Sequence, residues 1–118
     1  MRSDVIKTGA GRAPARAMLR ATGLDGESIA KPLVAVVHTW SDVSPCNLNH
    51  RDLAAQVAAG IRAAGGTPIE FNTIAVTDGI AMGTSGMRYS LVSREIITDS
   101  IEAAVEGHCL DAMVVLCG

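Results

Sequence analysis

The chain has few aromatic side chains and little net charge. Only one tryptophan, one tyrosine and one phenylalanine occur among 118 residues, and the formal net charge is −2. No block of lysine and arginine is present. Proteins that bind nucleic acids need basic surfaces, and those that bind single strands also use aromatic side chains on which bases stack. We therefore expect no nucleic acid among the partners of this protein.

Long apolar runs and paired cysteines are also missing. No apolar stretch is long enough to span a bilayer, and the first residues lack the apolar core of a signal peptide. The three cysteines, Cys46, Cys109 and Cys117, are an odd number, which argues against a closed disulfide framework. These absences predict no membrane partner and a cytoplasmic, reducing location, with the thiols free or bound to metal.

Apolar runs of β-branched residues alternate with helical patterns along the chain. Three helices are expected, at residues 13–24, 49–66 and 88–107, and three strands, at residues 33–37, 69–76 and 110–118. Strands separated by helices indicate an α/β fold, in which a parallel sheet has flanking helices. The run from Leu33 to Val37 is continuously apolar, so the first strand is expected to be buried on both faces, and the third strand is also expected to be buried. A domain that ends on a buried strand without a covering helix suggests part of a longer protein.

Polar residues and glycines follow the first two strands. Cys46 lies in the loop after the first strand, and Asp78 lies in Thr77-Asp78-Gly79, directly after the predicted second strand. Ligands of parallel α/β sheets bind beyond the carboxyl ends of the strands. Cys46, Asp78 and Cys117 are therefore expected at the same edge of the sheet.

Cys46 and Asp78 each allow two interpretations. A free cysteine is commonly a small buried hydrophobe, but the polar neighbours of Cys46, and a helix expected just after it, favour a thiolate nucleophile or metal ligand. An aspartate beside a glycine is common in turns, whereas a carboxylate at the carboxyl end of a strand suits a hard cation such as Mg²⁺. Residue type alone does not decide between these alternatives.

The other reactive side chains carry weaker signals. Cys109, at a helix-to-strand junction, is expected to be structural, and His50 and His108 are expected to be surface or capping residues. The glycines at 79, 83 and 86 match no phosphate-binding motif, so no nucleotide site is predicted.

Three longer motifs occur in order: SDVSPCN, FNTIAVTDGIAMGTSGM and YSLVSREIITDSIEAA. Together with the first 23 residues, they resemble the family of dihydroxy-acid, 6-phosphogluconate and sugar-acid dehydratases, over essentially all 118 residues. Members of that family are several times longer. The resemblance therefore implies that residues 1–118 are the N-terminal part of the α/β domain of a larger, two-domain enzyme.

The resemblance also implies an activity, that of a hydro-lyase. The expected reaction is dehydration of 2,3-dihydroxy-3-methylbutanoate, and of its methylpentanoate analogue, to the 2-keto acid in valine and isoleucine biosynthesis, by a homodimer. The family uses Mg²⁺ and an iron–sulfur cluster, which is of the [2Fe-2S] type in the dihydroxy-acid and sugar-acid members. By resemblance, Cys46 is a cluster ligand and Asp78 a Mg²⁺ ligand, whereas Cys117 lies next to a family cysteine position and does not match it. No catalytic residue is expected within residues 1–118, so this chain alone is expected to be inactive.

One position departs from the family pattern. Ser85 stands where many dihydroxy-acid members have a glutamate, which puts any role of that position in doubt. The run from Thr77 to Met82 resembles the dihydroxy-acid branch more than the 6-phosphogluconate branch. A 6-phosphogluconate or aldonic-acid dehydratase stays an alternative, as does a non-catalytic α/β binding module.

Overall fold

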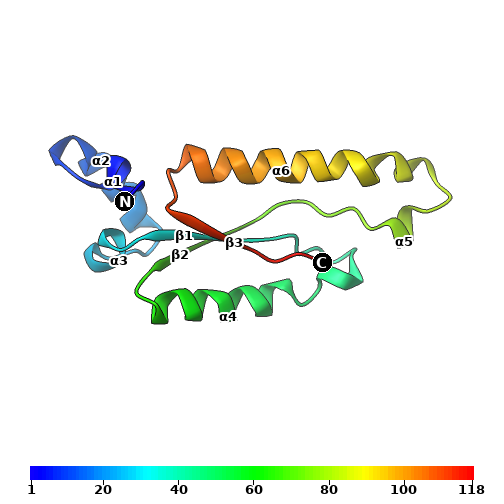
Figure 1. The fold of residues 1–118 in the computed structure, drawn as a ribbon, viewed down its shortest axis with the longest axis horizontal. Helices are drawn as coiled ribbons and strands as arrows, with labels where there is room; N and C mark the ends of the chain where they lie inside the picture. The colour runs from blue at the N-terminus through cyan, green and yellow to red at the C-terminus, as the bar shows by residue number, and fades with distance from the viewer.

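The computed structural model describes residues 1–118 as an elongated α/β arrangement (Figure 1). The strands are β1 (Leu33–His38), β2 (Thr67–Asn72) and β3 (Ala112–Val115). The helices are α1 (Asp4–Lys7), α2 (Ala13–Ala21), α3 (Gly26–Ala30), α4 (His50–Ala63), α5 (Asp78–Ala81) and α6 (Tyr89–Gly107). Short 3-10 turns lie at Ala10–Arg12, Pro45–Asn47 and Ser85–Arg88. None of the helices combines the length and apolarity needed to cross a membrane.

The three strands form one parallel sheet in the order β2-β1-β3. Helix α4 lies along one face of the sheet and α6 along the other, while the first three helices lie beyond one end of the strands (Figure 1). The predicted fold class, a parallel sheet with flanking helices, is confirmed.

The core is centred on β1, because this strand has a neighbour on each side and a helix on each face. Leu33, Ala35 and Val37 form a buried cluster with Leu110, against which Ile101 and Val105 of α6 pack, among other side chains. Side chains alternate along a strand, so Val36 faces the opposite layer, where α4 packs on β1 and β2. The continuous apolar run of β1 is thus explained by burial on both faces.

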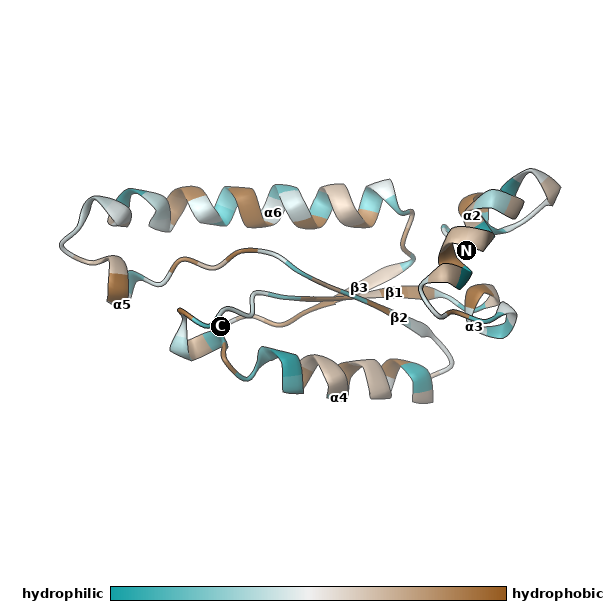
Figure 2. Ribbon diagram, turned by 180° about the vertical axis from the view of Figure 1, so that it is seen from behind, coloured by the Kyte–Doolittle hydropathy of each residue, from teal (hydrophilic) through white to brown (hydrophobic).

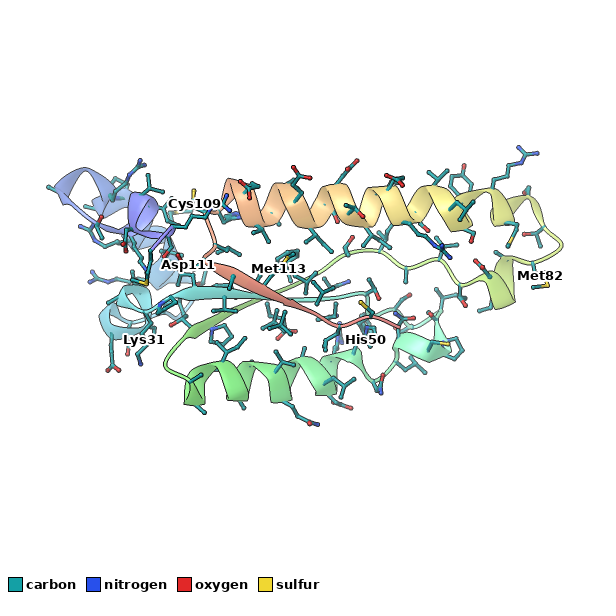
Figure 3. The ribbon with its side chains drawn as sticks, in the orientation of Figure 1. Lys31, His50, Met82, Cys109, Asp111 and Met113 are labelled. Carbon is teal, nitrogen blue, oxygen red and sulfur yellow. The ribbon has the colours of Figure 1, made fainter.

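The prediction that the third strand is buried is wrong. All four residues of β3 are exposed, with Met113 at 54% and Val115 at 38%. β3 is an edge strand, paired only with β1, and α6 leaves much of its outer surface uncovered (Figure 3). A run of apolar residues reads the same in a central strand and in an edge strand, so the sequence pattern did not distinguish them.

The second strand is shorter than predicted. β2 starts at Thr67, not after Pro68, and ends at Asn72, because its partner β1 ends at His38. The proline is tolerated since β2 is an edge strand. The apolar segment 73–77 continues in extended form toward α5 (Figure 2), so Asp78 does not directly follow the strand, as the sequence had suggested. The predicted glycine loop after it contains α5 and a 3-10 turn.

Helix α6 ends in a Schellman turn in which Cys109 adopts the left-handed conformation, with a φ of 52°. The Leu110 N–H donates to the Val105 carbonyl, and the Cys109 N–H donates to the Glu106 carbonyl. Leu110 is buried, and Val105 packs against its cluster. Cys109 is therefore structural, as predicted. Its role is to terminate α6, more than to fill the hydrophobic core.

Asp111 joins the N-terminal segment to the sheet (Figure 3). Its carboxylate accepts hydrogen bonds from the Ser3 N–H and hydroxyl, at 2.9 and 2.5 Å, and from the Leu33 N–H at 2.8 Å. Partial burial raises the pKa of Asp111, but these three donors and the nearby Lys7 charge outweigh it, so the pKa lies below its ordinary value of 3.8.

Replacing Asp111 with asparagine is expected to destabilise the protein by about 2 kcal/mol at pH 7, because the amide cannot accept all three hydrogen bonds. Since the folded pKa is lowered, the Asp111 contribution is present above pH 3.8 and is lost as pH falls through the folded value. Urea unfolding of wild type and Asp111→Asn should therefore converge in strong acid. Asp99→Asn, on the exposed side of α6, is the control. Equal midpoints for Asp111→Asn and wild type at pH 7 would contradict this role.

Candidate functional site

A cavity of about 350 Å³ opens at the carboxyl ends of β1 and β3. In a 2-1-3 strand order, the crossover from β1 to β2 carries α4 on one face of the sheet and the crossover from β2 to β3 carries α6 on the other (Figure 1), and such switch points are where open α/β sheets bind ligands. Val37 of β1 and Val115 of β3 line the cavity, together with Thr39 and Leu116 just beyond the ends of these strands. The cavity therefore lies where the fold alone would place a ligand site.

Cys46 is presented to this cavity by a short 3-10 turn, Pro45–Asn47. The thiol is free and exposed, whereas Asn47 beside it is buried. The Asn47 amide accepts a hydrogen bond from the Ser44 hydroxyl at 2.5 Å and donates to the Thr39 hydroxyl at 2.6 Å. These bonds tie the turn to the end of β1. Cys46 thus lies on a turn that is held in place by hydrogen bonds. Because its side chain is exposed, it is not a packing residue in this structure.

The end of the chain after β3 packs tightly against the same turn. A Cβ atom at Gly118 would lie 2.8 Å from the Asn47 side-chain nitrogen and 3.1 Å from His50 Nε2. Only glycine allows this approach without displacing one of the two side chains. The connections after β1 and β3 are therefore fitted to each other at the cavity.

His50 is buried, so its predicted surface or capping role is wrong (Figure 3). It is the first residue of α4, and its Nδ1 accepts a long hydrogen bond, 3.4 Å, from the Thr39 N–H. Burial, and then the charge of nearby His38, lower the pKa of His50. The ring therefore stays neutral near pH 7, in the form that can accept this bond. His108 is exposed and lies at the end of α6, as predicted.

Asp78 lines the cavity from the opposite side, as the first residue of α5. The Ser90 hydroxyl donates to its Oδ1 at 2.5 Å. The extended segment that leads to Asp78 is held by a 2.7 Å hydrogen bond between the hydroxyls of Thr73 and Ser100. Both contacts come from α6, so this helix, more than the sheet, positions the carboxylate.

Helix α6 contributes polar side chains that sequence reasoning missed. Ser90, Ser93 and Arg94 all line the cavity. Arg94 takes part in none of the ion pairs of the structure. Serines and an arginine on a helix have no distinguishing spacing, although all three lie in the motif YSLVSREIITDSIEAA that carried the family resemblance.

The structure brings both predicted ligands to one cavity. Cys46 and Asp78 line it together with Cys117, whereas Cys109 and Ser85 do not. No three His, Cys, Asp or Glu side chains gather closely enough to hold a metal ion by themselves. A metal ion bound at either residue would therefore need donors beyond those that residues 1–118 bring together.

These features define an α/β protein with a cavity at the switch point of a parallel sheet. The family model described as dihydroxy-acid/6-phosphogluconate dehydratase N-terminal matches residues 31–118. The chain belongs to this family, and the resemblance that its motifs indicated is confirmed.

Several relatives carry the name dihydroxy-acid dehydratase. The protein of Koribacter versatilis is 52% identical over 117 residues, 99% of this chain and 20% of the relative. That of Methanosarcina barkeri is 53% identical, over 98% of this chain and 21% of the relative. That of Thermus thermophilus is 54% identical, over 97% and 20%. The chain thus spans about a fifth of the length of these relatives.

Proposed function

We propose that this chain supplies part of the active site of a dihydroxy-acid dehydratase, which converts 2,3-dihydroxy acids such as 2,3-dihydroxy-3-methylbutanoate to 2-keto acids. The observation that carries the proposal is that Cys46 and Asp78 line one cavity at the switch point. The identity of 52–54% to relatives with that name supports it.

The donor types fit the metals that we propose. A thiolate is a ligand for an iron–sulfur cluster, and a carboxylate oxygen is a ligand for Mg²⁺. Cys46 is free and exposed on a fixed turn. Asp78 has one oxygen held by Ser90, and no hydrogen bond of the structure reaches the other. We assign Cys46 to the [2Fe-2S] cluster and Asp78 to Mg²⁺, with the remaining ligands supplied from outside these residues.

The dehydration removes the proton at C2 and the hydroxyl at C3, and the resulting enol becomes the 2-keto acid. When bound, the two metal groups supply Lewis acidity for the departing hydroxyl and positive charge for the substrate carboxylate. The chain itself orients the two ligand side chains through Asn47 and Ser90. Arg94 adds a positive charge without an acidic partner, which favours entry of an anionic substrate.

Turnover of purified whole protein tests this proposal. After anaerobic cluster reconstitution and addition of Mg²⁺, we expect kcat/KM for 2,3-dihydroxy-3-methylbutanoate to exceed that for 6-phosphogluconate and for gluconate by about a hundredfold or more, since a site built for one polar substrate leaves its groups unpaired with another. The 2-keto acid is measured as its hydrazone. No turnover of any of these acids would favour a non-catalytic module.

The second candidate is a 6-phosphogluconate or aldonic-acid dehydratase. The matching family model covers both dihydroxy-acid and 6-phosphogluconate dehydratases, so membership of the family does not decide between them. Faster turnover of 6-phosphogluconate or gluconate in the same assay would establish this alternative.

A further inference from the structure

The hydrogen bond from Ser90 engages only one of the two carboxylate oxygens of Asp78. Ser90, in the first turn of α6, is buried and donates to Asp78 Oδ1 at 2.5 Å. No hydrogen bond or ion pair of the structure involves Oδ2. Both residues line the cavity. The carboxylate is therefore held by one oxygen while the other is available to a ligand in the cavity.

Little else holds the helix that carries Asp78. α5 has four residues, and it packs mainly on the 3-10 turn that follows it. The apolar side chains beside it are exposed, Ile80 at 58% and Met82 at 69%, and Met82 lies at the far tip of the molecule (Figure 3). Because packing does not fix the orientation of Asp78, the hydrogen bond from α6 becomes its main constraint.

We propose that Ser90 is a positioning residue for Asp78, which orients the carboxylate so that Oδ2 can bind Mg²⁺. The inference rests on the proposed function. A hydroxyl that holds one carboxylate oxygen removes rotational freedom before the metal arrives, so less conformational entropy is lost on binding. Outer partners of metal ligands act in this way, and their loss commonly weakens metal binding by about 10- to 100-fold.

Metal titration of the whole, chelator-treated protein tests the role of Ser90. Mn²⁺ serves as the probe, because its free-ion electron paramagnetic resonance signal disappears on binding, and Mg²⁺ competition gives the affinity for Mg²⁺. Ser90→Ala is expected to weaken binding by about 10- to 100-fold. Ser90→Thr, which keeps the hydroxyl, is expected to stay close to wild type.

Ser93→Ala is the matched control. Ser93 is buried one turn further along α6 and lines the same cavity, but its hydroxyl donates to the Ser90 carbonyl within the helix. The Ser93→Ala protein is expected to bind Mn²⁺ with the affinity of wild type. Equal weakening in Ser90→Ala and Ser93→Ala, or failure of Ser90→Thr to restore affinity, would reduce Ser90 to a structural residue and overturn the proposal.

The proposed function and this inference can fail separately. If Asp78→Asn binds Mn²⁺ as tightly as wild type, the assignment of Asp78 to the metal is wrong, and the role of Ser90 falls with it. If Asp78→Asn loses the metal while Ser90→Ala retains it fully, only the positioning role is overturned. Circular dichroism of each variant shows whether α6 is intact.

Discussion

Serine in place of Cys46 is expected to leave the protein folded but without the iron–sulfur cluster that we propose. A serine hydroxyl is a hard, protonated donor at neutral pH and does not replace a thiolate on iron. The Cys46 side chain is exposed, and the turn beneath it is held by Asn47, Ser44 and Thr39. The substitution should therefore cost little stability while it removes the proposed cluster ligand.

The measurements are iron content, visible absorbance and dehydratase turnover of the anaerobically reconstituted whole protein. We expect the thiolate-to-iron absorption to disappear and turnover to fall by about a thousandfold or more, the equivalent of several kcal/mol of Lewis-acid stabilisation. Cys117→Ser is the control, because this thiol lines the same cavity and is also exposed. Full iron content in Cys46→Ser would show that Cys46 is not a ligand.

The fold class and the placement of Cys46 and Asp78 could be predicted from the sequence. Runs of β-branched residues and apolar residues at helical spacing were sufficient to predict the α/β class. Ligands of parallel sheets bind beyond the carboxyl ends of the strands, and this property predicted that Cys46 and Asp78 lie at the same edge of the sheet. The structure confirms that both line one cavity. These predictions succeeded because they rest on periodicity and on a general property of parallel sheets, which do not depend on individual side-chain contacts.

Contacts between distant segments could not be predicted in the same way. The bonds of Ser90 to Asp78 and of Asn47 to Thr39 join residues 12 and 8 positions apart across connections of irregular shape. Serine and asparagine are common in loops and helix ends, so their presence indicates no partner. His50 is buried because the end of the chain after β3 closes over it, a tertiary effect that a helix-start pattern does not reveal.

Asparagine in place of Asp78 is expected to abolish the response of the protein to Mg²⁺ at millimolar concentration. The substitution keeps the shape of the side chain, and its amide oxygen can still accept the hydrogen bond from Ser90. What is lost is the negative charge, which a hard divalent cation requires of its ligands. The expected result is a loss of Mg²⁺ affinity of about a hundredfold or more, since carboxylate ligands are the main source of charge in such sites.

Turnover as a function of Mg²⁺ concentration measures this effect, alongside iron content. Asp78→Asn should keep its cluster, because Cys46 lies on a separate connection held by its own hydrogen bonds. Asp42→Asn removes an exposed carboxylate near the Cys46 turn that does not line the cavity, and it should behave as wild type.

An Asp78→Asn protein with an unchanged Mg²⁺ requirement would assign Asp78 to the turn that starts α5, the alternative that its position beside a glycine leaves open. Loss of the cluster together with Mg²⁺ would instead show that the two metal sites depend on each other through the shared cavity.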